Sequence, residues 1–272
     1  MPLPLGFVTD SGGFEWLDLA VPFTVVFLYL VLCYFFPRPF LRPLWWLVTR
    51  VHYRMRVFDA AKFPRTGGAL IVSNHLSYVD WMLIWMACPR RVRFIAAASH
   101  SKNPFLKFCL KVVGTIPIDA KSGPKALIES MKRIAERLDR GEVICVFPEG
   151  KLTRTGNMAR FSRGLEKILG FTQTAVPIVP VNLWGLWGSI FSYRYGKLFF
   201  KWPERLRRRT AVVWGDPLPK ETKAEDVRLK IQHLSAKAGI EQSDFLLPVH
   251  RQFLRKGVRF RAAFVDTAGL KP

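Results

Sequence analysis

The stretch from Leu70 to Asp80 holds a histidine and an aspartate in a spacing that suits acid–base chemistry. An apolar run that follows two glycines predicts a buried strand ending at Ser73. Ser77 can then cap a helix, with Asp80 in the first turn of that helix. Because His75 precedes the helix, its loop can fold back and bring the imidazole to the carboxylate. This arrangement predicts a general base with an orienting carboxylate.

The same residues have two simpler interpretations. Asp80 is then only the acidic member of a capping box whose partner is Ser77. His75 is then an exposed loop histidine without a chemical role. The rest of the chain decides between these interpretations and the catalytic one.

Charge and composition restrict the class of partner. The 272 residues include 42 Lys and Arg against 20 Asp and Glu, which gives a net charge of +22. Such a balance favours binding to polyanionic partners, namely nucleic acid, an anionic membrane or phosphorylated substrates. We find no zinc-ligand spacing, basic zipper or aromatic RNA-binding signature. Because the abundant aromatic residues lie inside apolar stretches, a membrane surface is favoured and nucleic acid is not expected.

The four cysteines lie among apolar residues, and none forms a close pair. They indicate small buried or membrane-side residues in a reducing compartment. Neither a disulfide nor a metal site is expected.

Alternating strand and helix patterns predict an α/β fold, with a central mixed sheet flanked by helices. The loops that follow the strands around Ile71 and Val146 are then expected to share one crevice. We expect three parts, listed by residue number: N-terminal membrane-anchoring helices in 1–60, a catalytic domain in 61–220, and a C-terminal helix and tail in 221–272.

The N-terminal part is expected to form a membrane-associated helical hairpin. Leu19 to Phe36 runs for 18 residues without a charge, which is at the lower limit for a bilayer span. Arginines follow this segment, so a span would place the catalytic part on the cytoplasmic face of the membrane. Leu44 to Phe58 has the pattern of an amphipathic helix lying in the interface. The alternatives are a half-inserted hairpin for the first segment and an ordinary core-packed helix for the second.

The segment from Gly188 to Arg209 mixes aromatic and basic residues. An exposed mixture of this kind suits a membrane surface. The alternative is a strand with one buried face, which would account for part of the aromatic residues.

Four blocks in order resemble those of the glycerolipid acyltransferase family, which includes the lysophospholipid (1-acylglycerol-3-phosphate) acyltransferases. Together they extend over about residues 60–220. The blocks are Asn74-His75 with Asp80, Gly114 to Asp119, Phe147-Pro-Glu149-Gly150, and Val176 to Pro180.

Two departures from the family pattern concern the acceptor. Ala120 stands where the family usually has arginine, and the third block continues as Lys151-Leu-Thr-Arg154-Thr. The longer third block is more similar to the acyltransferase part of the bifunctional 2-acylglycerophosphoethanolamine acyltransferase/acyl-acyl-carrier-protein synthetases. The tail from Arg255 to Leu270 resembles the opening of an adenylate-forming synthetase domain, as in a larger fused protein.

The resemblance implies transfer of a fatty acyl group from acyl-CoA or acyl-acyl-carrier protein (acyl-ACP) to the free hydroxyl of a lysophospholipid. His75 is then the base and Asp80 its orienting partner, no metal or cofactor is needed, and a backbone N–H near the third block stabilises the oxyanion. Lys151 and Arg154 are expected to hold the acceptor phosphate, while Glu149 shapes the loop or contacts the glycerol. The residues expected at the substrates are Asn74, Glu149, Gly150, Lys151 and Arg154.

Both lysophosphatidic acid and lysophosphatidylethanolamine remain as acceptors. Because Ala120 lacks a charge, we favour a phosphodiester lysolipid such as lysophosphatidylethanolamine, alongside or instead of lysophosphatidic acid. Two rival functions remain open. One is a non-catalytic basic membrane-binding protein, and the other is a thioesterase-like hydrolase in which water replaces the lysolipid.

Overall fold

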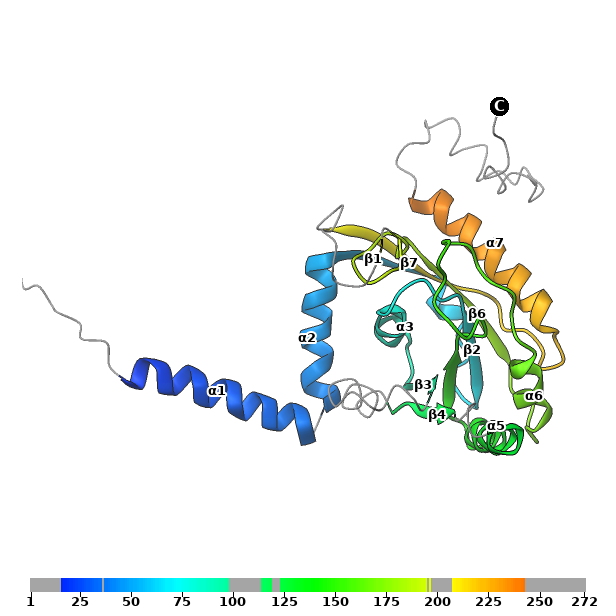
Figure 1. Cartoon of the computed structure of the whole chain (residues 1–272), viewed down its shortest axis with the longest axis horizontal. Helices are drawn as coiled ribbons and strands as arrows, with labels where there is room; N and C mark the ends of the chain where they lie inside the picture. Colours follow the sequence, from blue (N-terminus) through cyan, green and yellow to red (C-terminus); the bar gives the residue numbers. More distant parts are fainter. Residues whose placement is uncertain are drawn as a thin grey trace, which may run out of the picture. The chain divides into compact units, whose positions relative to one another are not determined.

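The computed structural model describes residues 16–35, 37–97, 114–118, 123–194, 196 and 207–242. The chain divides into two compact units, Met1–Trp45 and Trp46–Pro272. The larger unit contains His75. It also contains the sheet and its covering helices (Figure 1). The tail expected to resemble a synthetase domain lies outside the described residues.

Two N-terminal helices, α1 (Trp16–Phe35) and α2 (Pro37–His52), agree with the helical expectation for this part of the chain. Among the described residues, no helix combines the length and the hydropathy that a membrane crossing requires. The large apolar side chains of α1 are exposed over much of the helix. They are Val21, Phe23, Val25, Val26, Phe27, Leu28, Leu30 and Phe35.

The helix expected over Leu44 to Phe58 is wrong in its second half. The helix ends at His52, and β1 (Tyr53–Phe58) pairs in parallel with β7 (Arg208–Trp214). Tyr53 is buried while Arg54 and Arg56 are exposed, which is the two-residue alternation of a strand. In a short segment this alternation also fits helical spacing, and only the neighbouring strand β7 decides between the two. Strand β1 therefore belongs to the sheet of the larger unit.

Seven strands form one mixed sheet in the order β1-β7-β6-β2-β5-β3-β4. The six that follow β1 are β2 (Ala69–Ser73), β3 (Val92–Ala97), β4 (Ile116–Ile118), β5 (Val143–Val146), β6 (Ile178–Trp184) and β7 (Arg208–Trp214). Strands β6 and β7 are antiparallel, and all other neighbouring strands are parallel. The carboxyl ends of β2, β5 and β6 therefore lie at the same edge of the sheet as the amino ends of β1 and β7.

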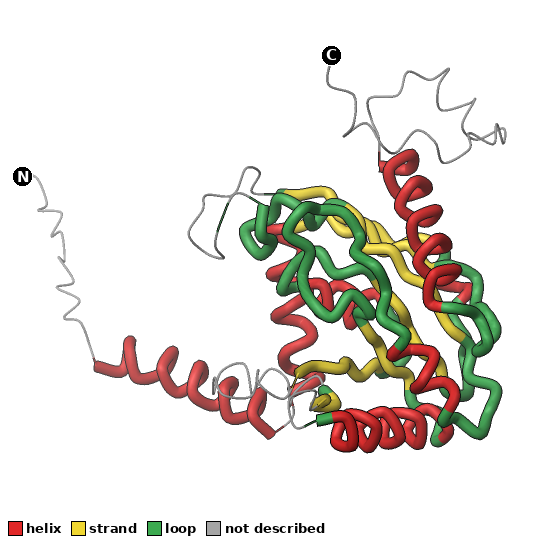
Figure 2. The backbone as a smooth tube through the Cα atoms, turned by 45° about the vertical axis from the view of Figure 1, so that its right-hand side comes forward, coloured by secondary structure: helices red, strands yellow, loops and turns green. Residues whose placement is uncertain are grey.

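Helices cover both faces of the sheet. On one face lies α3 (Asp80–Ala87), and on the other lie α5 (Pro124–Asp139), α6 (Gly164–Gly170) and α7 (Ala224–Gln242) (Figures 1 and 2). A short 3-10 helix, η1 (Ala60–Lys62), follows β1. The α/β class with a mixed, helix-flanked sheet is thus confirmed.

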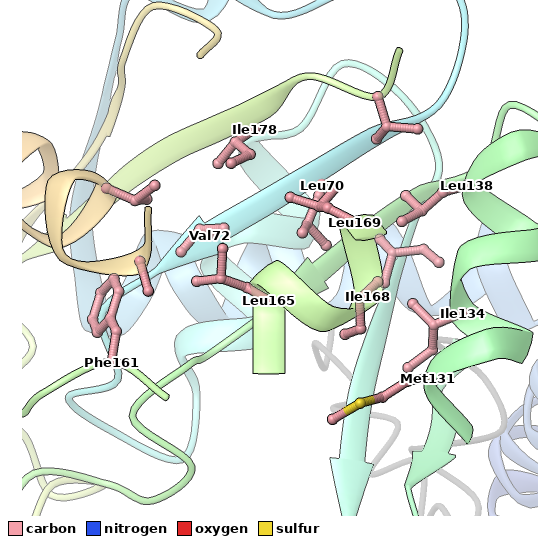
Figure 3. Packing of buried hydrophobic residues seen from close by; sticks show 14 of the residues in the cluster. Leu70, Val72, Met131, Ile134, Leu138, Phe161, Leu165, Ile168, Leu169 and Ile178 are labelled. Atoms are coloured by element: carbon pink, nitrogen blue, oxygen red, sulfur yellow. The ribbon is translucent and has the colours of Figure 1, made fainter. Parts of the chain in front are cut away.

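The larger core cluster fills the space between the sheet and helices α5, α6 and α7. Leu70 and Val72 point from β2 toward Leu165 and Ile168 of α6 (Figure 3). Helix α5 adds an apolar face, and α7 adds Val227 and Ile231. Full burial of a side chain of this size contributes about 1.5–3 kcal/mol, so these helices hold β2 firmly in the sheet.

We expect Gly68→Ala to destabilise the protein. A Cβ at this position would lie 2.0 Å from the carbonyl oxygen of Leu138, so either β2 or the end of α5 has to move. Such overpacking costs about 1–3 kcal/mol in free energy of unfolding, measured by urea denaturation. Gly170→Ala is the matched control because its Cβ meets no atom within 4 Å. Equal stability of the two variants would contradict the close approach of Gly68 to α5.

Candidate active site

His75 lies just beyond β2, at the sheet edge where β2 and its neighbours β5 and β6 present their carboxyl ends. Its Nδ1 is 2.8 Å from Oδ2 of Asp80. The imidazole is 22% exposed, whereas the Asp80 side chain is fully buried. The structure thus brings together the two residues in which the sequence predicts a base and its orienting carboxylate.

The Asp80 carboxylate accepts several hydrogen bonds from the loop that contains His75. Oδ2 accepts the backbone N–H groups of Leu76 and Ser77 at 2.5 and 3.0 Å, and Oδ1 accepts the Ser77 hydroxyl at 2.6 Å. Because the carboxylate accepts all of these hydrogen bonds, it is the acceptor in its contact with His75 as well, and Nδ1 of His75 carries the proton. The tautomer set in this way leaves the lone pair of His75 on Nε2.

The expected N-cap role of Ser77 needs correction. Helix α3 begins at Asp80, its N-cap is Val79, and no side chain caps it. Only half of a capping box is present, because the Asp80 carboxylate accepts the Ser77 N–H while the Ser77 hydroxyl turns to the carboxylate. Asp80 therefore braces the helix start and contacts His75 at the same time.

Phe147, the first residue after β5, forms one wall of the site. Its ring stacks on the His75 imidazole with centroids 4.2 Å apart and an interplanar angle of 14°. The carboxylate at Nδ1 and the phenyl ring against the plane of the imidazole together fix the orientation of the His75 side chain. The pattern Phe-Pro-Glu marked this loop, but no signal in the sequence assigned Phe147 a contact with His75.

Glu149 ties the loop after β5 to the loop after β2. Its Oε1 accepts the His75 backbone N–H and its Oε2 accepts the Ala159 N–H, both at 2.8 Å. Burial raises the pKa of Glu149, and these two hydrogen bonds partly lower it. Of the two roles expected for Glu149, its contacts fit the shaping of the loop. Gly150 follows at φ +68° and its N–H closes a turn onto Phe147 O, a conformation that favours glycine.

Asn74 is expected at the substrate, but its contacts do not support that prediction. Its amide nitrogen donates to Leu183 O at 2.9 Å, and its amide oxygen accepts the Leu183 N–H at 2.8 Å. The side chain is buried and extends the ladder between the ends of β2 and β6. Asn74 therefore positions the residue that follows it, His75.

Arg154 lies in the loop that runs beside His75. The neighbouring Thr153 donates its N–H to His75 O at 3.0 Å. The Arg154 guanidinium carbon lies 4.8 Å from the ring centre of Tyr193, and the Tyr193 hydroxyl is 2.8 Å from that of Tyr78. The Arg154 cation and the phenols of Tyr193 and Tyr78 thus form one group, which is linked to the loop of His75 through Thr153 and Tyr78. Lys151 is exposed in the same loop as Arg154.

Tyr78 and Tyr193 were not singled out from the sequence. They meet because the segment after β6 pairs with the loop before α3, through a bridge between Ser77 and Ser192 and a Tyr78 N–H···O Phe191 hydrogen bond of 3.0 Å. Burial, followed by the hydrogen bond with Tyr193, raises the pKa of Tyr78 to about 12. The Tyr78 phenol therefore stays neutral and able to donate a hydrogen bond at physiological pH.

Comparisons with known proteins agree with this geometry. Residues 54–184 match the sequence model of the Acyltransferase family. The 1-acyl-sn-glycerol-3-phosphate acyltransferase of Arabidopsis thaliana chloroplasts is 25% identical over 49% of this chain and 36% of its own length. The lyso-ornithine lipid O-acyltransferase of Pseudomonas aeruginosa is 32% identical over 51% of this chain and 52% of its own length.

Among solved structures, the 1-acyl-sn-glycerophosphate acyltransferase PlsC of Thermotoga maritima has the same fold. It aligns with a TM-score of 0.55 over 72% of this chain and 75% of its own, at 18% sequence identity. The chain spans 36% and 52% of the two curated relatives described above. The matched segment contains most of β1, strands β2 to β6, His75, Asp80 and Glu149, and through this segment the chain is similar to the Acyltransferase family.

Proposed function

We propose that this protein transfers a fatty acyl group from a thioester donor to the free hydroxyl of a lysophospholipid. The observation that supports this most is the contact between His75 Nδ1 and the buried Asp80 carboxylate. It leaves Nε2 as the basic nitrogen, at a sheet edge where α/β proteins bind their ligands. A free alcohol attacks a thioester poorly unless a base removes its proton.

The proposed reaction uses His75 twice. Nε2 first takes the proton of the lysolipid hydroxyl while the oxygen forms a bond to the thioester carbon, and the carbonyl electrons move to the oxyanion. The resulting imidazolium is stabilised by Asp80. When the intermediate collapses, the carbon–sulfur bond breaks and the leaving thiolate takes the proton from the imidazolium. The products are the diacyl lipid and the free thiol carrier, and no cofactor takes part.

We assign the acceptor headgroup to the side of the site that carries Arg154. The phosphate of a lysolipid is only a few bonds from the reacting hydroxyl, so its partner has to lie close to His75. Arg154 satisfies this condition through the hydrogen bond from Thr153 to His75. Its guanidinium can bind a phosphate bidentately, and the neutral Tyr78 phenol can donate one further hydrogen bond. Exposed Lys151 adds charge at the same side.

The names of the relatives support a lysolipid acceptor but differ in its headgroup. They specify 1-acyl-sn-glycerol-3-phosphate in the Arabidopsis protein and lyso-ornithine lipid in the Pseudomonas protein. We retain lysophosphatidic acid and lysophosphatidylethanolamine as acceptors here, with a preference for the phosphodiester. The donor is acyl-CoA or acyl-ACP.

We further propose attachment to a phospholipid surface on its cytoplasmic face. The net charge of +22 favours anionic lipid. The exposed apolar residues of α1 include Phe23 and Phe27, at 70% and 69% exposure. Insertion of such apolar side chains into the acyl boundary of a membrane lowers the free energy of the system and so favours membrane binding.

His75→Ala is expected to lower kcat/KM for acyl transfer by about a thousandfold, because general-base assistance contributes about 10²–10⁴. Asp80→Asn is expected to lower it by about a hundredfold or more through loss of the tautomer. The measurement uses a labelled acyl thioester and a lysolipid, with thermal unfolding recorded for each variant. The control is His233→Ala, since His233 is an exposed histidine of α7.

Wild-type turnover in a folded His75→Ala variant would rule out the proposed mechanism. Release of free fatty acid from the donor, with no transfer to any lysolipid, would identify the hydrolase instead. Lipid binding without either reaction would identify the non-catalytic membrane-binding protein.

Arg154→Ala is expected to raise the KM for the lysolipid about tenfold or more, since a hydrogen bond to a charged group contributes about 1.5–3 kcal/mol. The KM for the acyl donor should stay within about twofold. Arg160→Ala is the matched control because Arg160 is an exposed arginine of the same segment. A competition between lysophosphatidic acid and lysophosphatidylethanolamine then compares the two acceptors in one reaction. An effect of Arg154→Ala confined to the donor KM, with exclusive use of lysophosphatidic acid, would contradict both assignments.

A further inference from the structure

A second concentration of charge lies outside the site around His75. A cavity of about 420 Å³ opens where the end of α2 meets the amino ends of β1 and β7. Among the described residues that line it, none is acidic. The arginines that line it are Arg50, Arg54, Arg56, Arg207 and Arg209, and we refer to it as the arginine cavity.

The pairing of β1 with β7 produces this concentration of arginines. Arg54 and Arg209 are register partners on adjacent strands, so their side chains emerge on the same face. Arg56 lies on that face as well because side chains two apart share it. Like charges placed side by side across strands destabilise a sheet. An anion that binds between the guanidinium groups lowers this repulsion.

We propose that the arginine cavity binds the clustered phosphate groups of a nucleotide-bearing acyl donor, namely the diphosphate and 3′-phosphate of coenzyme A. This inference rests on the proposed acyl transfer and assigns its donor a binding site. Guanidinium groups match phosphate oxygens in bidentate geometry and keep their charge at all physiological pH values. The volume of the cavity lies in the range of small-molecule sites.

The position of the cavity distinguishes the donor from the acceptor. The amino ends of β1 and β7 share the sheet edge that carries His75, but β7 is two strands from β2, about 10 Å across the sheet. An acceptor phosphate cannot bind so far from the hydroxyl that reacts at His75. In coenzyme A, by contrast, the pantetheine arm separates the phosphates from the thioester, so its phosphates have to bind at a distance from His75.

The walls of the cavity fit a nucleotide better than a lipid headgroup. Trp46 is 52% exposed, and the Arg50 guanidinium carbon lies 5.5 Å from its ring centre. An indole with a guanidinium over its ring provides the kind of flat surface on which a purine stacks. Tyr53 forms part of the wall, and its pKa is raised to about 12 by burial first and also by the charge of Asp80.

The test measures binding of coenzyme A and of pyrophosphate to the full chain in detergent, by calorimetry and by Trp fluorescence. The cavity variant is Arg54→Gln/Arg207→Gln, and the control is Lys125→Gln/Arg133→Gln. All four residues are exposed, and both variants remove two positive charges. We expect the cavity variant to weaken both ligands at least tenfold and to raise the KM for acyl-CoA with little change in kcat. The control should stay within about twofold.

Three results would overturn the proposal. They are wild-type protein that binds neither probe, equal affinities in the two double variants, and loss of binding to phosphatidylglycerol vesicles in the cavity variant with coenzyme A binding unchanged. The last result would assign the cavity to anionic lipid. Failure of the proposed acyl transfer can be distinguished from failure of the cavity proposal. Normal turnover in His75→Ala would contradict the reaction mechanism, but it would leave the measured affinities for coenzyme A and pyrophosphate unchanged.

Discussion

The buried carboxylate of Asp80 is the constraint on which the site depends. A carboxylate without contact with water is costly to bury unless donors surround it. Here the donors are His75 Nδ1, two backbone N–H groups and the Ser77 hydroxyl, all within the residues that precede Asp80. Satisfying the carboxylate therefore requires the loop to fold back on the helix start. The orientation of the imidazole is a consequence of that requirement.

Contacts among the ends of three neighbouring strands hold the same loop. Asn74 joins the end of β2 to β6, and Glu149 joins the loop after β5 to the backbone of His75. The antiparallel pairing of β6 with β7 then brings the amino ends of β1 and β7 to this edge as well. One edge of the sheet thus holds the base His75, the arginine cavity and Arg154, which we propose to bind the acceptor phosphate. Part of the positive charge of the chain is concentrated at this edge, in addition to any role at a membrane.

Much of the fold could be predicted from the sequence because its signals are local. The strand predicted to end at Ser73 is β2, which does end there, and the strand expected around Val146 is β5. His75 and Asp80 were predictable as a pair, since five positions with a helix start between them allow only a short loop. Glu149 could be assigned to the site by its place after a buried strand, although its two backbone partners could not.

The sequence by itself determined the α/β class, the order of most elements and the pairing of His75 with Asp80. Only the tertiary structure decided that Tyr53–Phe58 is a strand, because its alternation becomes stable when β7 supplies the hydrogen bonds. It also decided that Asn74 braces β6, that Phe147 stacks on His75 and that Tyr78 meets Tyr193. These contacts join segments that lie far apart along the chain or in different loops. Local propensity carries no information about them, since they depend on which strands become neighbours in the sheet.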